Sequence, residues 1–267
     1  MTLIIGIKCK DGIVMAADGV ATLGSMGQKT VLQPTKKLWV LQEKMVIGVS
    51  GAVGLGQLLQ GKMESLWCDD KALRGKKPYE AMSVISQGFR EYIIPELQVA
   101  QISIKTFGNA GLNSALTSTL LALPISQELC LFQFDPQGSP EQSTDELPFV
   151  SIGSGQTIAD PFLCLLRKVF WSEHQPIINE ALVAAIWTLV HAIEVNPGGV
   201  AEPIQVITMR QDGNNTVIKE LSPAELSEHR EMVKEAEKAI ADSLTSFREA
   251  IEDSDTTTEI PEPPTTV

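Results

Sequence analysis

The feature that most constrains the fold is the order in which strand-like and helix-like apolar segments follow one another. Pairs of short apolar runs alternate with pairs of segments whose apolar residues recur at helical spacing. The expected strands cover 3–9, 13–17, 37–41, 45–49, 118–123, 128–134, 204–209 and 216–221, and the expected helices cover about 55–66, 81–92, 157–171 and 177–194. Strands grouped with strands and helices grouped with helices predict an α+β fold, a two-sheet sandwich with helices outside, rather than a parallel sheet of alternating units.

A long amphipathic helix is expected after the last strand pair. Ser222, Pro223 and Glu225 match a capping box with proline at the first helical position. Apolar residues then recur on one stripe, at Leu226, Val233, Ile240, Leu244, Phe247 and Ile251. Thr, Glu and Pro dominate beyond it, which predicts a disordered tail. We therefore expect a domain over 2–221, a helix over 222–253 and a tail over 254–267.

Charge and composition argue against several classes of function. The net charge of −12 argues against nucleic-acid binding, which needs a basic surface. The four cysteines lack paired spacing and the three histidines have no neighbour at metal-ligand spacing, so we expect reduced thiols, no metal site and no cofactor. There is no signal-peptide pattern and no uninterrupted apolar run of the roughly 18 residues that span a bilayer. We expect a cytoplasmic protein without membrane contact.

The N-terminus offers a candidate nucleophile. Thr2 follows Met1, and a small second residue allows Met1 to be removed. The exposed threonine would then carry a hydroxyl and a free α-amine, whose reference pKa of about 8 suits a base at neutral pH. A Met-Thr start is common, however, and by itself indicates no catalysis.

A candidate charge pair lies further along the chain. Asp18 ends the apolar strand 13–17, where a carboxylate is expected to be partly buried and to need a partner. Either Lys36 or Lys37, at the start of the next strand pair, could be that partner. A lysine that stays charged beside a carboxylate can stabilise a nearby alkoxide. An ordinary ion pair at a strand end is the simpler interpretation of the same residues.

Two glycine-containing turns lead from strands into helices. Ser50 and Gly51 precede the first helix, where backbone N–H groups could hold an oxyanion. Gly153, Ser154 and Gly155 precede the third helix, where Ser154 would by default be an N-cap. The Ser50-Gly51 segment could also be a plain tight turn.

Together these segments resemble the proteasome β-subunit family, including the peptidase of the bacterial ATP-dependent two-subunit protease. The resemblance spans roughly residues 2–221. It is carried by Thr2 with the strand after it, the segment Gly12 to Gly24 (GIVMAADGVATLG), the stretch Thr35-Lys36-Lys37-Leu38 and the two glycine turns, all in matching order.

The resemblance implies a four-layer αββα sandwich, the N-terminal-nucleophile hydrolase fold, here with an added C-terminal helix. It implies a threonine endopeptidase in which Thr2 is the nucleophile, Asp18 orients Lys37, Gly51 donates to the oxyanion and Ser154 bonds the N-terminal amine. Residues implied to line the substrate pocket are Ala21, Thr22, Trp39, Val49 and Val53. Peptides or unfolded proteins would be cut inside a self-compartmentalising homo-oligomeric ring, which an ATPase unfoldase could feed.

The chain also departs from the family pattern. Leu3 follows Thr2 where the family usually has a second threonine, and the stretch 196–201 lacks the aspartate and serine of the Asp-x-x-Ser-Gly element that supports the amine. Two alternatives therefore stay open. One is a catalytically silent subunit that only assembles or binds a partner, and the other is a small-molecule amidase on the same scaffold.

Overall fold

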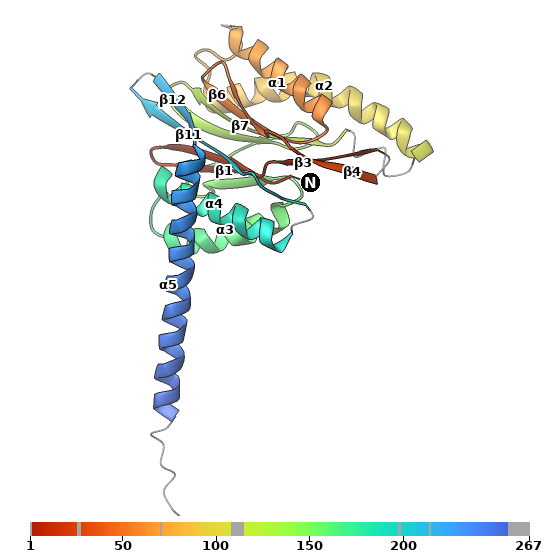
Figure 1. Ribbon diagram of the computed structural model, residues 1–267. Helices are drawn as coiled ribbons and strands as arrows, with labels where there is room; N and C mark the ends of the chain where they lie inside the picture. The colour runs from red at the N-terminus through yellow and green to blue at the C-terminus, as the bar shows by residue number, and fades with distance from the viewer. Residues whose placement is uncertain are drawn as a thin grey trace, which may run out of the picture.

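The computed structural model describes residues 2–25, 28–69, 71–107, 115–196, 199–213 and 215–255, with the side chains of 22–25, 28–32, 106–107 and 249–255 left out. Two antiparallel sheets lie between two pairs of helices, and a fifth helix extends away from the layers (Figure 1). This is the expected α+β sandwich in αββα order.

The first sheet has the strand order β10-β1-β2-β11-β12. Its strands are β1 (Ile4–Cys9), β2 (Gly12–Ala17), β10 (Phe149–Ile152), β11 (Gln205–Asp212) and β12 (Asn215–Glu220). The second sheet has the order β5-β6-β7-β8-β9, so that β5 is an edge strand. Its strands are β5 (Leu38–Leu41), β6 (Met45–Gly51), β7 (Thr117–Ile125), β8 (Glu128–Phe134) and β9 (Pro140–Gln142). A separate two-stranded ribbon consists of β3 (Val20–Ser25) and β4 (Gln28–Pro34).

Alternation of side chains along the strands produces three cores. On β1, Ile4 faces the second sheet, whereas Ile5 and Ile7 face the helices below the first sheet. The core between the sheets contains residues such as Met15 and Leu120 from opposite sheets. Every residue of β2 is buried, because helices cover one face of the strand and the second sheet covers the other.

The helices cover the outer faces of both sheets. The second sheet is covered by α1 (Val53–Cys68) and α2 (Pro78–Phe107), and the first by α3 (Gln156–Phe170) and α4 (Ile178–Val195) (Figure 1). Of the described helices, only α4 is long and apolar enough to cross a membrane by length and composition, and 56% of that window is buried within the molecule. Its apolar residues belong to the core below the first sheet.

The C-terminal helix α5 (Pro223–Asp255) starts where the capping box predicts. Glu225 Oε2 accepts hydrogen bonds from Ser222 N and Ser222 Oγ, at 2.9 and 2.8 Å. Its first half packs against α4, where Val233 is buried and Trp187 Nε1 donates to Glu237 Oε1 at 2.8 Å. The second half projects beyond the layers (Figure 1).

The differences from expectation have physical reasons. The ribbon β3–β4 was not expected, because polar residues such as Gln28, Lys29 and Gln33 interrupt the apolar pattern there. Strand β9 has only three residues and begins with proline, which is too short for a periodic signal. The helix α5 continues to Asp255, two residues beyond the expected end, and the rest of the expected tail lies outside the described residues.

Candidate functional site

Strand pairing brings the start of β1 next to the end of β2. Ile4 lies opposite Ala17, so Thr2 and Leu3 lie beside Asp18. Asp18 N donates to Leu3 O at 3.1 Å, and Leu3 N donates to Asp18 Oδ1 at 2.8 Å. The candidate nucleophile and the candidate acid, separated by a full hairpin in the sequence, are thus held together by the backbone of one residue.

The structure distinguishes the two adjacent lysines. Lys37 Nζ lies 2.6 Å from Asp18 Oδ1, and their side chains are 5% and 0% exposed. The Lys36 side chain is 66% exposed and pairs instead with Glu220 Oε2 at 3.2 Å. Lys37 is therefore the partner of Asp18, in agreement with the position that the resemblance implies.

The charge pair is held in an environment that disfavours charge. Burial lowers the pKa of Lys37 below its usual 10.5, while the neighbouring Asp18 opposes that shift. Asp18 Oδ2 is buried and has no hydrogen-bond partner among the described residues. The carboxylate of Asp18 at close range thus stabilises the ammonium of Lys37 where solvent contributes little.

The turn before α3 holds the backbone of Thr2. Thr2 N donates to Ser154 Oγ at 3.2 Å, and Gly155 N donates to Thr2 O at 3.1 Å. Gly153 has φ +101°, and a Cβ there would lie 2.2 Å from Thr2 O, so glycine is required for this approach. The N-cap of α3 is Gly155, which shows that Ser154 is not the cap that a default interpretation assigns.

The turn before α1 needs glycine for a similar reason. Gly51 has φ +129°, and a Cβ there would lie 2.1 Å from Leu116 O. The following residue, Ala52, donates its N–H to Thr117 Oγ1 at 3.1 Å. This geometry keeps Gly51 at the wall of the cavity that contains Thr2; its role as an oxyanion donor stays a prediction.

A cavity of about 670 Å³ unites most of the candidate residues. Of the predicted residues, it is lined by Thr2, Lys37, Gly51, Ser154, Ala21, Trp39, Val49 and Val53. Asp18 is fully buried and contacts Lys37. The side chain of Thr22 lies outside the described residues.

Sequence reasoning missed part of the cavity wall, which also includes Thr35, Lys36, Ser50, Gly56, Gln57 and Gln60. Val53, Gly56, Gln57 and Gln60 follow helical spacing on α1, on a different face from the core residues Leu55, Leu59 and Met63. That second stripe could have been found as a helical face directly after the Ser50-Gly51 turn. Among the described residues, no three His, Cys, Asp or Glu side chains form a group that could hold a metal ion.

Three solved structures illustrate the likeness of the fold. The Gly-1 mutant of Anbu from Hyphomicrobium sp. strain MC1 has a TM-score of 0.67 and 18% identity, covering 92% of this chain and 97% of that chain. Anbu (ancestral beta-subunit) from Yersinia bercovieri has a TM-score of 0.67 and 18% identity, over 91% and 97% of the two chains. The helical assembly of the Anbu complex from Pseudomonas aeruginosa has a TM-score of 0.67 and 17% identity, over 98% of each chain.

These identities support a shared fold and no more. No curated protein sequence matched the chain. The family model described as "Proteasome subunit" matches residues 2–167, which is more than half of the 267 residues and includes Thr2, Asp18, Lys37, Gly51 and Ser154. The chain therefore belongs to the proteasome subunit family.

Proposed function

We propose that the chain is a threonine endopeptidase of the N-terminal-nucleophile type, in which Thr2 becomes the nucleophile once Met1 is removed. The observation that carries this proposal is that Lys37, buried and paired with Asp18, lines the same cavity as Thr2, Gly51 and Ser154. Buried charge is costly, so a buried lysine–carboxylate pair at a cavity that also contains Thr2 suggests a functional role.

In the proposed reaction the Thr2 α-amine accepts the hydroxyl proton as Oγ1 bonds to the carbonyl carbon of the peptide. The Lys37 ammonium stabilises the oxygen of Thr2 as its proton leaves, and the N–H of Gly51 stabilises the carbonyl oxygen. The peptide C–N bond then breaks, and the leaving amine takes the proton from the Thr2 amine. Water next hydrolyses the ester and regenerates Thr2. Ser154, whose Oγ already accepts from Thr2 N, orients the amine.

One observation favours a catalytically silent subunit as the second candidate. The stretch that lacks the aspartate and serine begins with Asn196, the C-cap of α4, whose carbonyl accepts hydrogen bonds from Gly199 N and Val200 N. Of the described residues, only Ser154 provides a hydrogen-bond partner for Thr2 N. A small-molecule amidase would use the same site on smaller substrates.

Assembly and surroundings form part of the same proposal. One neighbouring structure is a helical assembly of the Anbu complex, and its chain is covered to 98%. We infer that this chain also forms a homo-oligomer that encloses its peptide substrates, in the cytoplasm, with an ATPase unfoldase as a candidate partner. The exposed apolar residues on the second half of α5 support a protein–protein contact.

Labelling with a covalent probe tests the activity. Intact mass shows whether Met1 is absent, and a peptide epoxyketone should add to Thr2 of the wild-type chain and not to the Thr2→Ala variant. Thr144→Ala, an exposed threonine outside the cavity, serves as the control and should be labelled like wild type. Hydrolysis of peptides separates a peptidase from an amidase that cleaves only simple amides. A Met1-free chain that assembles but is never labelled would instead support the silent subunit.

A further inference from the structure

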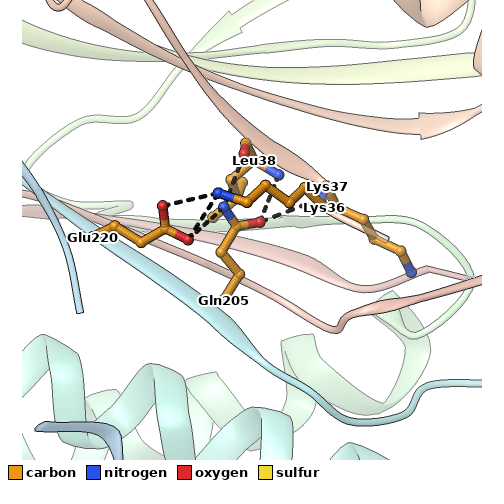
Figure 2. A network of polar contacts seen from close by, with 5 residues as sticks. All are labelled: Lys36, Lys37, Leu38, Gln205 and Glu220. Atoms are coloured by element: carbon orange, nitrogen blue, oxygen red, sulfur yellow. Dashed lines mark hydrogen bonds and ion pairs between the residues drawn. The ribbon is translucent and has the colours of Figure 1, made fainter. Parts of the chain in front are cut away.

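Gln205, the first residue of β11, is only 9% exposed, and its side-chain amide makes four hydrogen bonds within the protein. Its Oε1 accepts from Lys37 N at 3.3 Å and from Leu38 N at 3.1 Å. Its Nε2 donates to Leu38 O at 2.9 Å and to Glu220 Oε1 at 3.1 Å. Figure 2 shows the amide lying between Glu220 and the backbone of Lys37 and Leu38.

The pattern of donors and acceptors determines the orientation of this amide. Two N–H groups face Oε1 and two oxygens face Nε2. The reverse orientation would place donors against donors and acceptors against acceptors. Leu38 belongs to β5, the edge strand of the second sheet. The Gln205 amide forms hydrogen bonds with both the N–H and the C=O of Leu38, as a neighbouring strand would.

The same residue is tied to the strand that carries Asp18. Gln205 lies opposite Ala17 in the pairing of β11 with β2, and Asp18 is the next residue after Ala17. Thr35 N also donates to Gly19 O at 2.8 Å, so the segment before Lys37 is anchored to the residue after Asp18. The backbone of Lys37 is therefore fixed, through two separate contacts, relative to the carboxylate that its side chain must reach.

We propose that Gln205 is a positioning residue: its amide sets the backbone of Lys37 and Leu38 so that the Lys37 ammonium reaches both Asp18 and the hydroxyl of Thr2. This inference rests on the proposed peptidase function. The Lys37 side chain is only 5% exposed and has little room to change rotamer, so a shift of its backbone moves the ammonium with it. Displacement of a catalytic group by about 1 Å can cost on the order of 100-fold in rate.

Gln205→Met tests the proposal, because methionine has a similar length and no amide. The control is Gln211→Met on the same strand, where Nε2 donates to Gly213 O at 3.1 Å, away from the site. Two quantities are measured: hydrogen exchange of the amides in peptides covering 35–41, and the rate of Thr2 acylation by a peptide β-lactone, whose ring C–O bond opens as the ester forms, at varied concentration. We expect Gln205→Met to lose amide protection at 37 and 38 and to lower the maximal acylation rate about 10- to 100-fold. The half-saturating concentration should change much less than the maximal rate, since Ala21, Val49 and Val53, which also line the cavity, are untouched.

A second variant covers the case in which Gln205→Met does not fold. Gln205→Glu keeps the acceptor for Lys37 N and Leu38 N but turns an oxygen toward Leu38 O and Glu220. We expect slower acylation in this variant and partial recovery when Glu220→Gln is added, because a donor again faces an acceptor at that contact.

The outcomes separate the two proposals. Lost amide protection with an unchanged acylation rate would make Gln205 merely structural and overturn the inference. Retained protection in Gln205→Met would overturn it as well, since the amide would not be holding this segment. A wild-type chain that is never labelled at Thr2 would refute the peptidase function, and the positioning role with it, whatever the exchange data show.

Discussion

At the scale of single residues, main-chain contacts position Thr2, whereas the side chain of Lys37 carries the charge proposed for the chemistry. Thr2 and Leu3 are held through main-chain atoms by Ser154, Gly155 and Asp18. Lys37, in contrast, places a charge in a buried environment, where Asp18 at 2.6 Å stabilises it. Changes at Lys37 should therefore affect both stability and rate, whereas changes to the Thr2 side chain should affect the rate alone.

Lys37→Ala should lower peptidase activity by at least about 100-fold, the scale of one lost electrostatic group. It should also lower the free energy of unfolding, by about 3–5 kcal/mol if Asp18 stays ionised and unpaired. Steady-state hydrolysis and urea unfolding measure the two effects. Lys36→Ala should cause a much smaller loss, because its side chain is largely exposed and pairs with Glu220.

A paired variant separates the two effects. Asp18→Asn combined with Lys37→Met removes both buried charges, so stability should recover relative to Lys37→Ala while activity stays absent. An active double variant, or a dead Lys36→Ala with an active Lys37→Ala, would contradict the assignment.

The pH dependence follows from the lowered pKa of Lys37. Because burial holds this pKa below 10.5, activity that needs the ammonium should decline on the alkaline side at a pH below 10.5. The unfolded chain binds this proton more tightly than the folded one, so this group makes folding more favourable as the pH rises from the folded pKa to 10.5. Acylation rates measured across pH test the predicted alkaline decline in activity, and unfolding free energies test the predicted gain in stability with rising pH. An alkaline limb at or above 10.5 would contradict them.

The sequence could indicate some residues of the candidate site but not others. Thr2, Gly51 and Ser154 line one cavity and Asp18 contacts Lys37 at its wall; the sequence could indicate these positions because glycine turns and strand ends leave local signals. Spacing alone left Lys36 and Lys37 open, the resemblance implied Lys37, and the structure shows that Lys37 is the buried partner of Asp18. Gln205 gave no signal at all, since its partners at Lys37 and Leu38 are 168 and 167 positions away.

At the scale of elements, α1 presents two faces with different tasks. Leu55, Leu59 and Met63 pack on the second sheet, while Val53, Gln57 and Gln60 line the cavity. Val53, together with Ala21, Trp39 and Val49, forms an uncharged apolar part of the lining. The charged residues that also line the cavity, Lys36 and Lys37, are paired with Glu220 and Asp18. We therefore expect wild type to prefer an apolar side chain before the cleaved bond, because burying an unpaired charge there is costly. Cleavage mainly after Asp or Lys would contradict this.

Val53→Arg should shift that preference toward an acidic side chain by roughly 10-fold in kcat/KM, because a cation would then face the pocket. Val53 is 64% exposed, so the fold should tolerate the change. Leu58→Arg, on the same helix at 47% exposure and outside the cavity, is the matched control and should leave the preference unchanged. Peptide-library profiling measures both, and an unaltered Val53→Arg profile would remove α1 from the specificity wall.

At the scale of the whole molecule, the long C-terminal helix has two unlike halves. The first half lies on its own domain, through residues such as Leu226 and Val233. In the second half, Ile240, Leu244 and Phe247 are 52%, 65% and 67% exposed. Their spacing of four and three residues places them on one face, which a second copy of the chain would cover.

A chain that ends at Lys238 should form a smaller species than the full-length protein while keeping its helix and sheet signals. This cut retains the contact between Trp187 and Glu237, which a cut after Leu221 would destroy. Mass photometry and circular dichroism provide the measurements. Leu244→Glu with Phe247→Glu should act in the same direction, and Ser243→Glu with Ser246→Glu is the control. If the shortened chain formed the same oligomer and dissociated in the same way as the full-length protein, the second half of α5 would have no role at the interface.

The main-chain hold on residue 2 has a consequence for how such a family diversifies. The hydrogen bonds of Ser154, Gly155 and Asp18 are made with the backbone of residues 2 and 3, so none of these contacts depends on the Thr2 hydroxyl. One nucleotide change in that codon would end the proposed reaction while a complete, well-formed protomer is still produced. Duplicated genes can therefore lose chemistry in a single step and persist as building blocks, so active and inert members are separated by very little evolutionary distance.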